Sequence, residues 1–370
     1  MILTRKFVIP FLFFLISGFT NSFVPAREII QKKDNTVNIG LLIQDKSDTA
    51  AVEGAEIAIR KANQESGLEG HPFKLIVKSM EGPWGTGSKQ AVSLVFDDNV
   101  WAILGSHDGR NAHLVEQVSA KTRVVYMSAW SGDPTLAQAF IPWYFSCVPN
   151  DECQAAAIVQ EITVEKKMNR VAVISDLNYD SKSLEKYFIR KAKESGRINS
   201  TEFTISNPRS DLTGLADSVY QSHVECIVIF SEPAAVSELL HLLNGKNFKV
   251  PVFGPFSVLN ENESMTGIRK ELNELEVVAP YDTNDPSYQS FRKEFVKAFS
   301  KSPGPAACYA YDGMSMIIKA IRESGTPDYQ KIKESLTKMD YKGVTGRIGF
   351  DDKGNRTGPC KLSYFINLTP

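Results

Sequence analysis

Few residues of this sequence are grouped in a way that could support catalysis. Five histidines stand singly along the 370 residues, and only His107, which is followed directly by Asp108, has a neighbour with which it could act as an acid–base pair. No GxSxG motif supplies an accompanying nucleophile. We therefore expect a protein that is not an enzyme.

One glycine-rich stretch superficially resembles a phosphate-binding loop. It runs from Gly82 to Lys89, but Lys89 follows Ser88, whereas the loop requires Lys directly after Gly and then Ser or Thr. A nicotinamide-binding domain would carry GxGxxG after its first strand, and the corresponding turn, Gln44–Ser47, has no glycine. We expect no nucleotide and no other cofactor.

The cysteines leave two interpretations open. They number five, so at least one is unpaired within the chain. Cys147 and Cys153 are close enough in sequence to form a local bridge in an oxidising compartment, and both could equally be buried thiols. No CxxC motif or Cys/His cluster suggests a metal site.

The first 26 residues have the pattern of a secretory signal peptide. Arg5 and Lys6 precede an apolar run, Phe7–Phe19, and the small residues Val24 and Ala26 follow. The apolar run is too short to cross a bilayer, which needs about 20 helical residues. We expect cleavage near Ala26, export across the inner membrane and a soluble periplasmic product.

The composition excludes several other classes of protein. Lys and Arg total 42 and Asp and Glu total 43, so no basic surface for nucleic acid is expected. Residues of the apolar type make up 42% of the chain, which argues against disorder. The length allows two domains.

Strand and helix patterns alternate twice along the chain. Short apolar runs at Val37–Ile43, Phe73–Val77, Trp101–Leu104 and Val124–Met127 are separated by helical patterns, and a link at Ile141–Pro149 follows. The alternation then restarts with runs at Val171–Ser175, Glu202–Ile205, Cys226–Phe230 and Val250–Gly254. Such alternation predicts parallel sheets covered by helices on both faces. The sequence therefore predicts an α/β protein with two doubly wound lobes.

Ligands of open α/β sheets bind beyond the carboxyl ends of the strands. Two such lobes facing each other would form a cleft that hinge motion can close on a ligand. We therefore expect binding residues just after the strands, in Gln44–Ser47, Glu81–Trp84, Ser106–Arg110, Ser128–Ser131, Asp176–Tyr179, Ser231–Pro233 and Pro255–Phe256.

The order of residues resembles the type I periplasmic solute-binding proteins, and within them the branched-chain amino-acid (Leu/Ile/Val)-binding family. The resemblance is carried by EGAEIAIRKANQESGLEG (Glu53–Gly70), VVYMSAWSGDPTL (Val124–Leu136), YAYDGMSMIIKAI (Tyr309–Ile321) and YKGVTGRIGFDDKGNR (Tyr341–Arg356). It covers essentially the whole chain after the signal peptide.

The resemblance implies two lobes joined by a three-segment hinge, each lobe built from discontinuous segments. Lobe I would comprise residues 27–146 and 283–343, and lobe II residues 147–282 and 344–370. It also implies a chain that captures an amino acid or similar small polar ligand in the cleft and passes it to the permease subunits of an ABC transporter. A ligand sensor of the same fold, acting on a regulatory partner, is the alternative.

The family's binding residues transfer only in part. Family members hold an amino acid with hydroxyls and amides of the first lobe and an acid of the second. The family's first-lobe serine falls near Gly109, its hydroxyl after the fourth strand near Trp130-Ser131, and its cleft tyrosine at Tyr179. Phe256 replaces the family's acid, and Glu232 stands on a neighbouring loop.

The same residues suggest a physical basis for binding. A helix that begins near Gly109 would present free N–H groups to an anion, and Arg110 could add a bidentate contact or simply lie exposed. Aromatic walls are expected from Trp84, Trp130, Tyr179 and Phe256, with His107 on the same rim. The hypothesis is a ligand with a negative group on the first lobe and a donor group facing Glu232.

Overall fold

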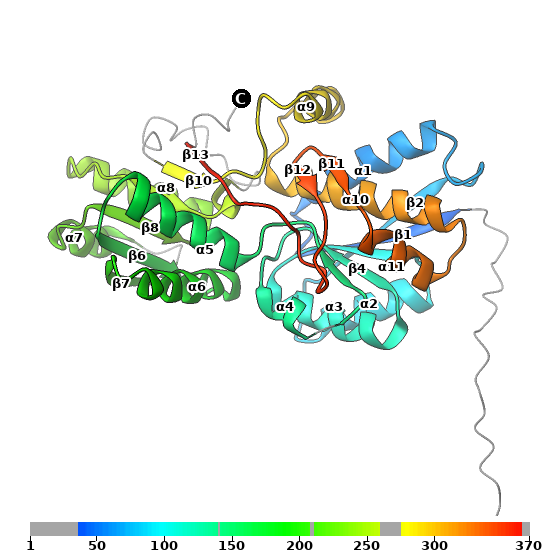
Figure 1. Cartoon of the computed structure of the whole chain (residues 1–370), viewed down its shortest axis with the longest axis horizontal. Helices are drawn as coiled ribbons and strands as arrows, with labels where there is room; N and C mark the ends of the chain where they lie inside the picture. Colours follow the sequence, from blue (N-terminus) through cyan, green and yellow to red (C-terminus); the bar gives the residue numbers. More distant parts are fainter. Residues whose placement is uncertain (1–35, 140, 208–210, 260–274, 365–370) are drawn as a thin grey trace, which may run out of the picture. The chain divides into compact units, whose positions relative to one another are not determined.

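Two separate parallel sheets organise the chain in this computed structural model (Figure 1). It describes residues 36–139, 141–207, 211–259 and 275–364, and the predicted signal peptide lies outside them. This α/β architecture with two doubly wound sheets confirms the predicted fold class.

The first sheet has five strands in the order β2-β1-β3-β4-β5, all parallel. The strands are β1 (Val37–Ile43), β2 (Phe73–Ser79), β3 (Ala102–Ser106), β4 (Val125–Ser128) and β5 (Tyr144–Ser146). The helices packed around it are α1 (Thr49–Gln64), α2 (Thr86–Phe96), α3 (Gly109–Thr122), α4 (Pro134–Gln138), α10 (Pro305–Ser324) and α11 (Tyr329–Thr337).

The second sheet repeats this strand order and adds one antiparallel strand. Its order is β13-β10-β9-β8-β6-β7, with β6 (Arg170–Asp176), β7 (Asn199–Ile205), β8 (Cys226–Phe230), β9 (Val252–Gly254), β10 (Leu275–Val278) and β13 (Leu362–Tyr364). Its helices include α5 (Asp151–Gln160), which continues into η1 (Glu161–Glu165), α6 (Tyr179–Ser195), α7 (Thr213–Gln221) and α8 (Pro233–Gly245). A short turn, η2 (Phe256–Leu259), follows β9.

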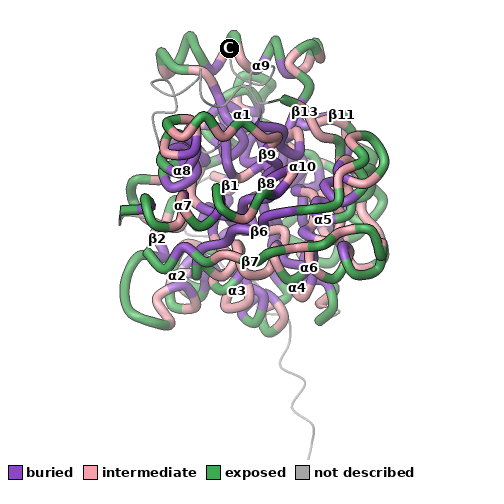
Figure 2. Tube along the Cα trace, turned by 90° about the vertical axis from the view of Figure 1, so that its left-hand side faces the viewer, coloured by how far each residue is buried: buried purple, intermediate pink, exposed green. Residues whose placement is uncertain are grey.

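Helix α10 returns to the first sheet from late in the sequence. It packs closely on α1, where the backbone of Ala307 lies directly against Gly54, so any side chain at position 54 would overlap the Ala307 carbonyl oxygen. Nearly all of its side chains are buried, which suits a helix that packs between the sheet and a second helix. Figure 2 shows burial along the chain, with central strands such as β6 and β8 buried and the outer helices carrying exposed stretches.

Three segments pass from one sheet to the other. They connect β5 to α5 (residues 147–150), β10 to α9 (Pro286–Phe299), and the hairpin of β11 (Tyr341–Gly343) and β12 (Gly346–Ile348) to β13. The predicted boundary at residues 343 and 344 falls inside that hairpin, and the assignment of residues to the two lobes stays a prediction.

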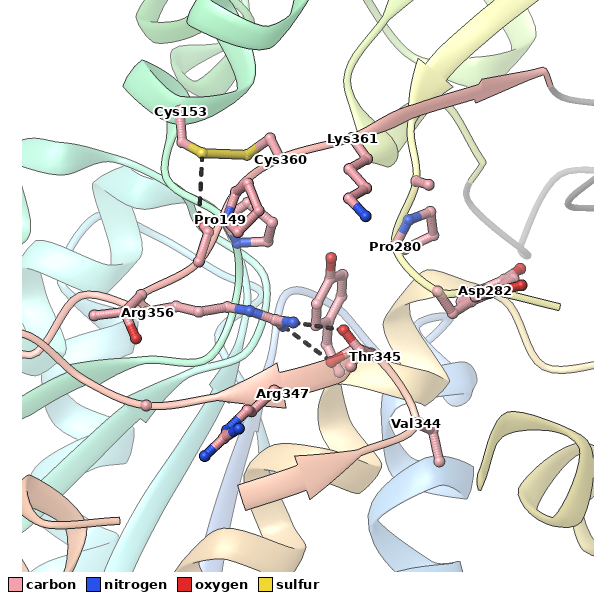
Figure 3. Close-up of a pocket in the computed structure, with 18 of the residues that line it drawn as sticks. Pro149, Cys153, Pro280, Asp282, Val344, Thr345, Arg347, Arg356, Cys360 and Lys361 are labelled. Atoms are coloured by element: carbon pink, nitrogen blue, oxygen red, sulfur yellow. Dashed lines mark hydrogen bonds between the residues drawn. A yellow bond between two sulfur atoms is a disulfide. The ribbon is translucent and has the colours of Figure 1, made fainter. Parts of the chain in front are cut away.

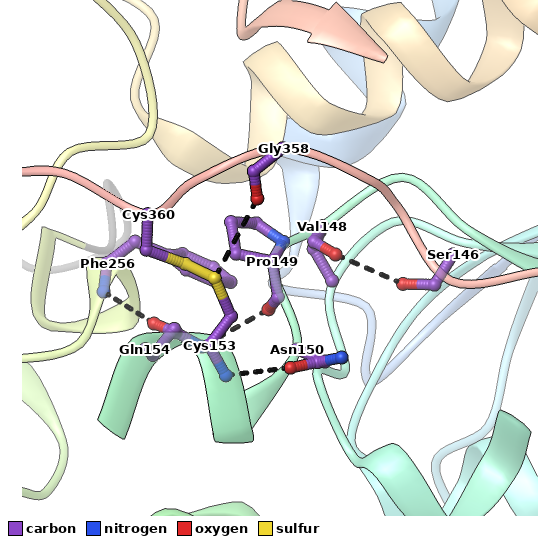
Figure 4. Close-up of a disulfide and its surroundings, with 9 residues drawn as sticks. All are labelled: Ser146, Val148, Pro149, Asn150, Cys153, Gln154, Phe256, Gly358 and Cys360. Carbon is purple, nitrogen blue, oxygen red and sulfur yellow. Dashed lines mark hydrogen bonds between the residues drawn. A yellow bond between two sulfur atoms is a disulfide. The ribbon is translucent and has the colours of Figure 1, made fainter. Parts of the chain in front are cut away.

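The cysteine pairing decides between the two interpretations that the sequence left open. Cys153 on α5 pairs with Cys360 just before β13, 207 residues later (Figure 4). Cys147 is a buried free thiol, whose Sγ contacts the carbonyl oxygens of Ser128 and Tyr309. The bridge between Cys147 and Cys153 is therefore wrong, because Cys147 follows a buried strand of the first sheet whereas Cys153 lies on a helix that meets the last crossover.

Candidate functional site

A cavity lies where the central strands of the first sheet end. Its volume is about 160 Å³, and it is lined by residues that follow β1, β3 and β4 together with one residue of α10: Gln44, Asp45, Asp48, Ser106, His107, Asp108, Trp130 and Ala306. In the strand order 2-1-3-4-5 the chain leaves in opposite directions after β1 and β3, and this switch point is where such sheets bind ligands. The cavity therefore lies beside three of the predicted strand-end loops.

His107 forms part of the cavity wall as a neutral side chain. It is 1% exposed, and burial lowers its pKa to about 4. Its Nδ1 lies 3.2 Å from the carbonyl oxygen of Asp108, so Nδ1 carries the proton, and the Tyr126 hydroxyl approaches Nε2 at 3.4 Å. His107 therefore brings no positive charge to the cavity at neutral pH.

Acidic and amide groups dominate the rest of the cavity wall. Asp108 accepts hydrogen bonds from the Asn111 N–H at 2.8 Å and from Gln44 Nε2 at 3.2 Å, which fixes its carboxylate at the start of α3. Asp45 accepts from the N–H and hydroxyl of Ser47 through one oxygen, Oδ1. The wall thus presents mainly hydrogen-bond acceptors.

The start of α3 is occupied by a carboxylate from the second sheet's side. The Gly109 N–H donates to Asp180 Oδ1 at 2.8 Å, and Asp180 belongs to the first turn of α6. A Cβ on Gly109 would come within 2.9 Å of Asp180 Oδ1 and Ser131 Oγ and within 2.8 Å of the Tyr179 ring. The glycine therefore permits close contact between α3, the loop after β4 and α6.

Burial raises the pKa of Asp180 to about 7, and the Gly109 N–H counteracts part of this rise. The nearby charges of Asp108 and Asp133 raise it further. Asp180 thus occupies the position at which the sequence predicts the ligand's negative group.

A second polar cluster joins α3, the loop before α4 and α6. The Tyr179 hydroxyl donates to Asp133 Oδ2 at 2.8 Å, and His113 Nε2 lies 3.1 Å from the same oxygen. Burial alone would raise the pKa of Asp133, but bonds from His113, Thr135 and Tyr179 outweigh it and lower the pKa to about 2. The hydrogen bonds to Asp133 and to Glu116 raise the pKa of His113 to about 9. Asp133 and His113 therefore form a charged pair at neutral pH.

An aromatic row joins elements of both sheets. Trp130 after β4 meets Phe256 after β9 edge to face, with 5.4 Å between ring centroids. Phe256 is 2% exposed and in turn contacts Tyr309 of α10 at 5.0 Å. Of these rings only Trp130 lines the cavity, and Phe256 and Tyr309 pack behind it.

The corresponding switch point of the second sheet also carries acids. Asp176 at the end of β6 accepts from the Ser231 hydroxyl at 2.8 Å and from the Glu232 N–H at 3.2 Å. Glu232 precedes α8 but its side chain does not cap that helix; it accepts from Asn178 Nδ2 at 3.0 Å.

A larger cavity of about 630 Å³ lies among the three crossing segments (Figure 3). Each of the three crossing segments contributes lining residues, among them Pro149, Pro280 and Gly358. The side chain of Lys361 extends toward the interior of the cavity in Figure 3. Arg356 donates to the Cys147 carbonyl oxygen and the Thr345 hydroxyl, so its guanidinium holds crossing segments together. This cavity therefore lies at the crossing segments, including Ala279 and Pro280 directly after β10, and it is separate from the β1/β3 switch point.

Comparison with known proteins assigns the family. A family model described as periplasmic binding protein matches residues 36–366. The chain belongs to the periplasmic binding protein family. Its fold matches that of LivJ, the branched-chain amino acid transporter substrate-binding protein of Streptococcus pneumoniae solved with isoleucine, with a TM-score of 0.80 at 19% identity over 90% of this chain and 97% of that one.

Two further relatives show how widely ligands vary across this fold. The leucine-, isoleucine-, valine-, threonine- and alanine-binding protein of Pseudomonas aeruginosa is 22% identical, covering 82% of this chain and 81% of its own. A solute-binding protein of R. palustris, solved with benzoate, matches with a TM-score of 0.78 at 13% identity over 88% of this chain and 92% of that one.

The structure brings together most of the predicted site residues of this family member, but not all. Gly109, Ser131 and Tyr179 meet at one point, and His107 and Trp130 line the adjacent cavity. Phe256 reaches that cavity through Trp130.

The other three predicted site residues lie apart from this group. Trp84 is 73% exposed and Arg110 is exposed, and neither lines the cavity. Glu232 lies at the second switch point.

The predicted site residues did not include Asp133 and Asp180, two carboxylates in the contact between α3, the loop after β4 and α6. Each lies one or two residues beyond a predicted strand-end loop. Reading the first helical turn together with the loop would have included both. In the described part of the chain no cluster of His, Cys, Asp and Glu could hold a metal ion, and no helix has the length and apolar character needed to cross a membrane.

Proposed function

We propose that this periplasmic binding protein captures a small polar molecule at the facing strand ends of its two sheets and delivers it to the permease subunits of an ABC transporter. The observation that carries the proposal is the cavity at the β1/β3 switch point, beside which Asp180 of α6 contacts Gly109 and Phe256 of η2 contacts Trp130. Because elements of both sheets meet beside this cavity, its surroundings change when the sheets move relative to each other, as in hinge closure on a ligand.

Export supports the same proposal. The N-terminal sequence predicts a signal peptide, and a disulfide between Cys153 and Cys360 suits an oxidising compartment such as the periplasm. We place the mature protein there as part of the proposal.

Amino acids are the first ligand class to test. The Pseudomonas and Streptococcus proteins are named for branched-chain and other small amino acids, but this chain has Phe256 where the resemblance places an acid. We therefore extend the class to amides, amines and aromatic acids of similar size.

Thermal unfolding of the purified mature chain with each compound tests the binding step. A ligand at about 100 times its Kd stabilises the bound state by about 2.7 kcal/mol, which gives a measurable rise in melting temperature. Loss of uptake of the same compound by cells that lack this chain would then support transport. Binding without any effect on uptake would contradict delivery to a transporter.

One relative favours a sensing function as the second candidate. Glutamate receptor 3.4 of Arabidopsis thaliana is 21% identical over 90% of this chain, which spans 39% of the receptor. A sensor would bind its ligand equally well, but deletion of the chain would leave uptake unchanged and alter a response to the compound instead.

A further inference from the structure

The charges around the first-sheet cavity differ in sign from those expected for a carboxylate site. Three carboxylates, Asp45, Asp48 and Asp108, line the cavity. None of its lining residues is cationic at neutral pH, because the one histidine is buried and neutral. An anionic ligand group placed here would meet like charges at short range.

Two backbone donors at the start of α3 are already used. The Gly109 N–H donates to Asp180 Oδ1 at 2.8 Å, and the Asn111 N–H donates to Asp108 Oδ1 at 2.8 Å. The two carboxylates thus use donors that a helix N-terminus would otherwise offer to an anion. An anion at the Gly109 N–H would have to displace Asp180.

An uncommitted hydroxyl and an aromatic face point to a ligand in the same cavity. Ser106 is 2% exposed and lines the cavity, yet its hydroxyl has no partner among the residues that the structure describes. Because this residue lines the cavity, an occupant can hydrogen-bond to its hydroxyl. Trp130 lies across the cavity border, and an indole is the best aromatic surface for a cation.

We propose that the ligand places a cationic nitrogen group, an ammonium or amidinium, in the first-sheet cavity, where Asp45 and Asp108, the Ser106 hydroxyl and the Trp130 ring receive it. This inference rests on the proposed binding function and reverses the ligand orientation that the sequence predicts. A volume of about 160 Å³ accommodates a head group, since whole drug-sized ligands occupy about 300–1,000 Å³. The remainder of the ligand would extend along Trp130 and Phe256.

The test uses matched compounds that differ only in charge. Leucine carries both groups, 3-methylbutylamine retains the amine alone, and 4-methylpentanoate retains the carboxylate alone; benzylamine and benzoate form a second pair. Calorimetry on the mature chain should show binding of both amines, with each amine at least tenfold tighter than its matched acid. Tighter binding of 4-methylpentanoate or benzoate than of the matching amine would overturn the inference while leaving the proposed binding function intact.

A variant pair locates the cation. Asp45→Asn keeps the shape of the loop after β1 and removes one cavity charge, and it should weaken amine binding on the order of tenfold. Glu56→Gln, an exposed position on α1 outside the cavity, removes the same charge and should leave binding unchanged. Equal loss in both variants would indicate only long-range attraction and would contradict the assigned position. No binding of any of the five compounds at millimolar concentration would contradict both this inference and the proposed function for ligands of this size.

Discussion

The disulfide between Cys153 and Cys360 should contribute a large part of the stability of this chain. The bond closes a loop of 207 residues that includes most of the second sheet and helices α9 to α11. Restricting the unfolded chain over such a loop is worth about 5 kcal/mol in the chain-entropy model, and measured losses of native disulfides are about 2–5 kcal/mol. We expect the double variant Cys153→Ser/Cys360→Ser to fall within that range.

The expected change in melting temperature follows from chain length. Unfolding entropy near the transition is about 2.1 cal/mol/K per residue, or roughly 0.7 kcal/mol per degree for about 340 mature residues. A loss of 2–5 kcal/mol therefore lowers the melting temperature by about 3–7 °C. Calorimetry of the oxidised protein, the reduced protein and the double variant measures this change.

Two controls separate the disulfide from other effects. Reductant should lower the melting temperature of the wild type to that of the double variant, and it should have no effect on the double variant itself. Thiol titration of the denatured, unreduced wild type should find three free cysteines, namely Cys147, Cys226 and Cys308. Coincident melting curves with and without reductant, or five free thiols, would refute the reasoning.

Two other predictions concern packing and protonation. Gly54→Ala should lower the free energy of unfolding, measured in denaturant, by about 1–3 kcal/mol, because its Cβ would overlap the Ala307 carbonyl oxygen. The control Gly214→Ala, at an exposed position on α7, should change it by less than about 1 kcal/mol and in the opposite direction. Equal effects of the two substitutions would contradict the close contact between α1 and α10. The raised pKa of His113, about 9, means that its stabilising contribution is full below pH 6.5 and is lost as pH rises through 9. Wild type should therefore lose more stability than His113→Gln between pH 6 and pH 10 in urea titrations, and parallel pH profiles would show that the bond to Asp133 adds nothing.

The long, regular elements could be predicted from sequence because their patterns are local. Cys226–Phe230 is an uninterrupted apolar run and Val37–Ile43 is apolar apart from Asn38 and Gly40, and both are fully or almost fully buried strands. By contrast β5, with three residues, lies inside a stretch interpreted as a link, and β10, with four, was not predicted. Strands this short depend on neighbouring strands for their pairing, and the sequence alone carries little signal for them.

Helix α11 and the disulfide were missed for related reasons. The helix buries only Ile332 and Leu336, so its apolar stripe is too narrow to stand out from a polar surface segment. Cysteine partners cannot be deduced from spacing when 207 residues separate them, so the sequence offered only the nearer pair, Cys147 and Cys153, as one of two open alternatives. In both cases the deciding contacts are long-range.

The position of the candidate site could be predicted from local sequence, whereas the charged groups that surround it could not. Strand-end loops identified Asp45, Ser106 and Trp130 as neighbours, because the carboxyl ends of adjacent parallel strands share one edge of the sheet. The acceptor at the start of α3, Asp180, could not be placed there from sequence, because it comes from a helix 71 residues after Gly109 and binds its N–H group. A helix N-terminus attracts anions only while its amides are free, so a carboxyl group from the facing element reduces the attraction for an anion at this point, which is the basis of the proposed preference for a cation.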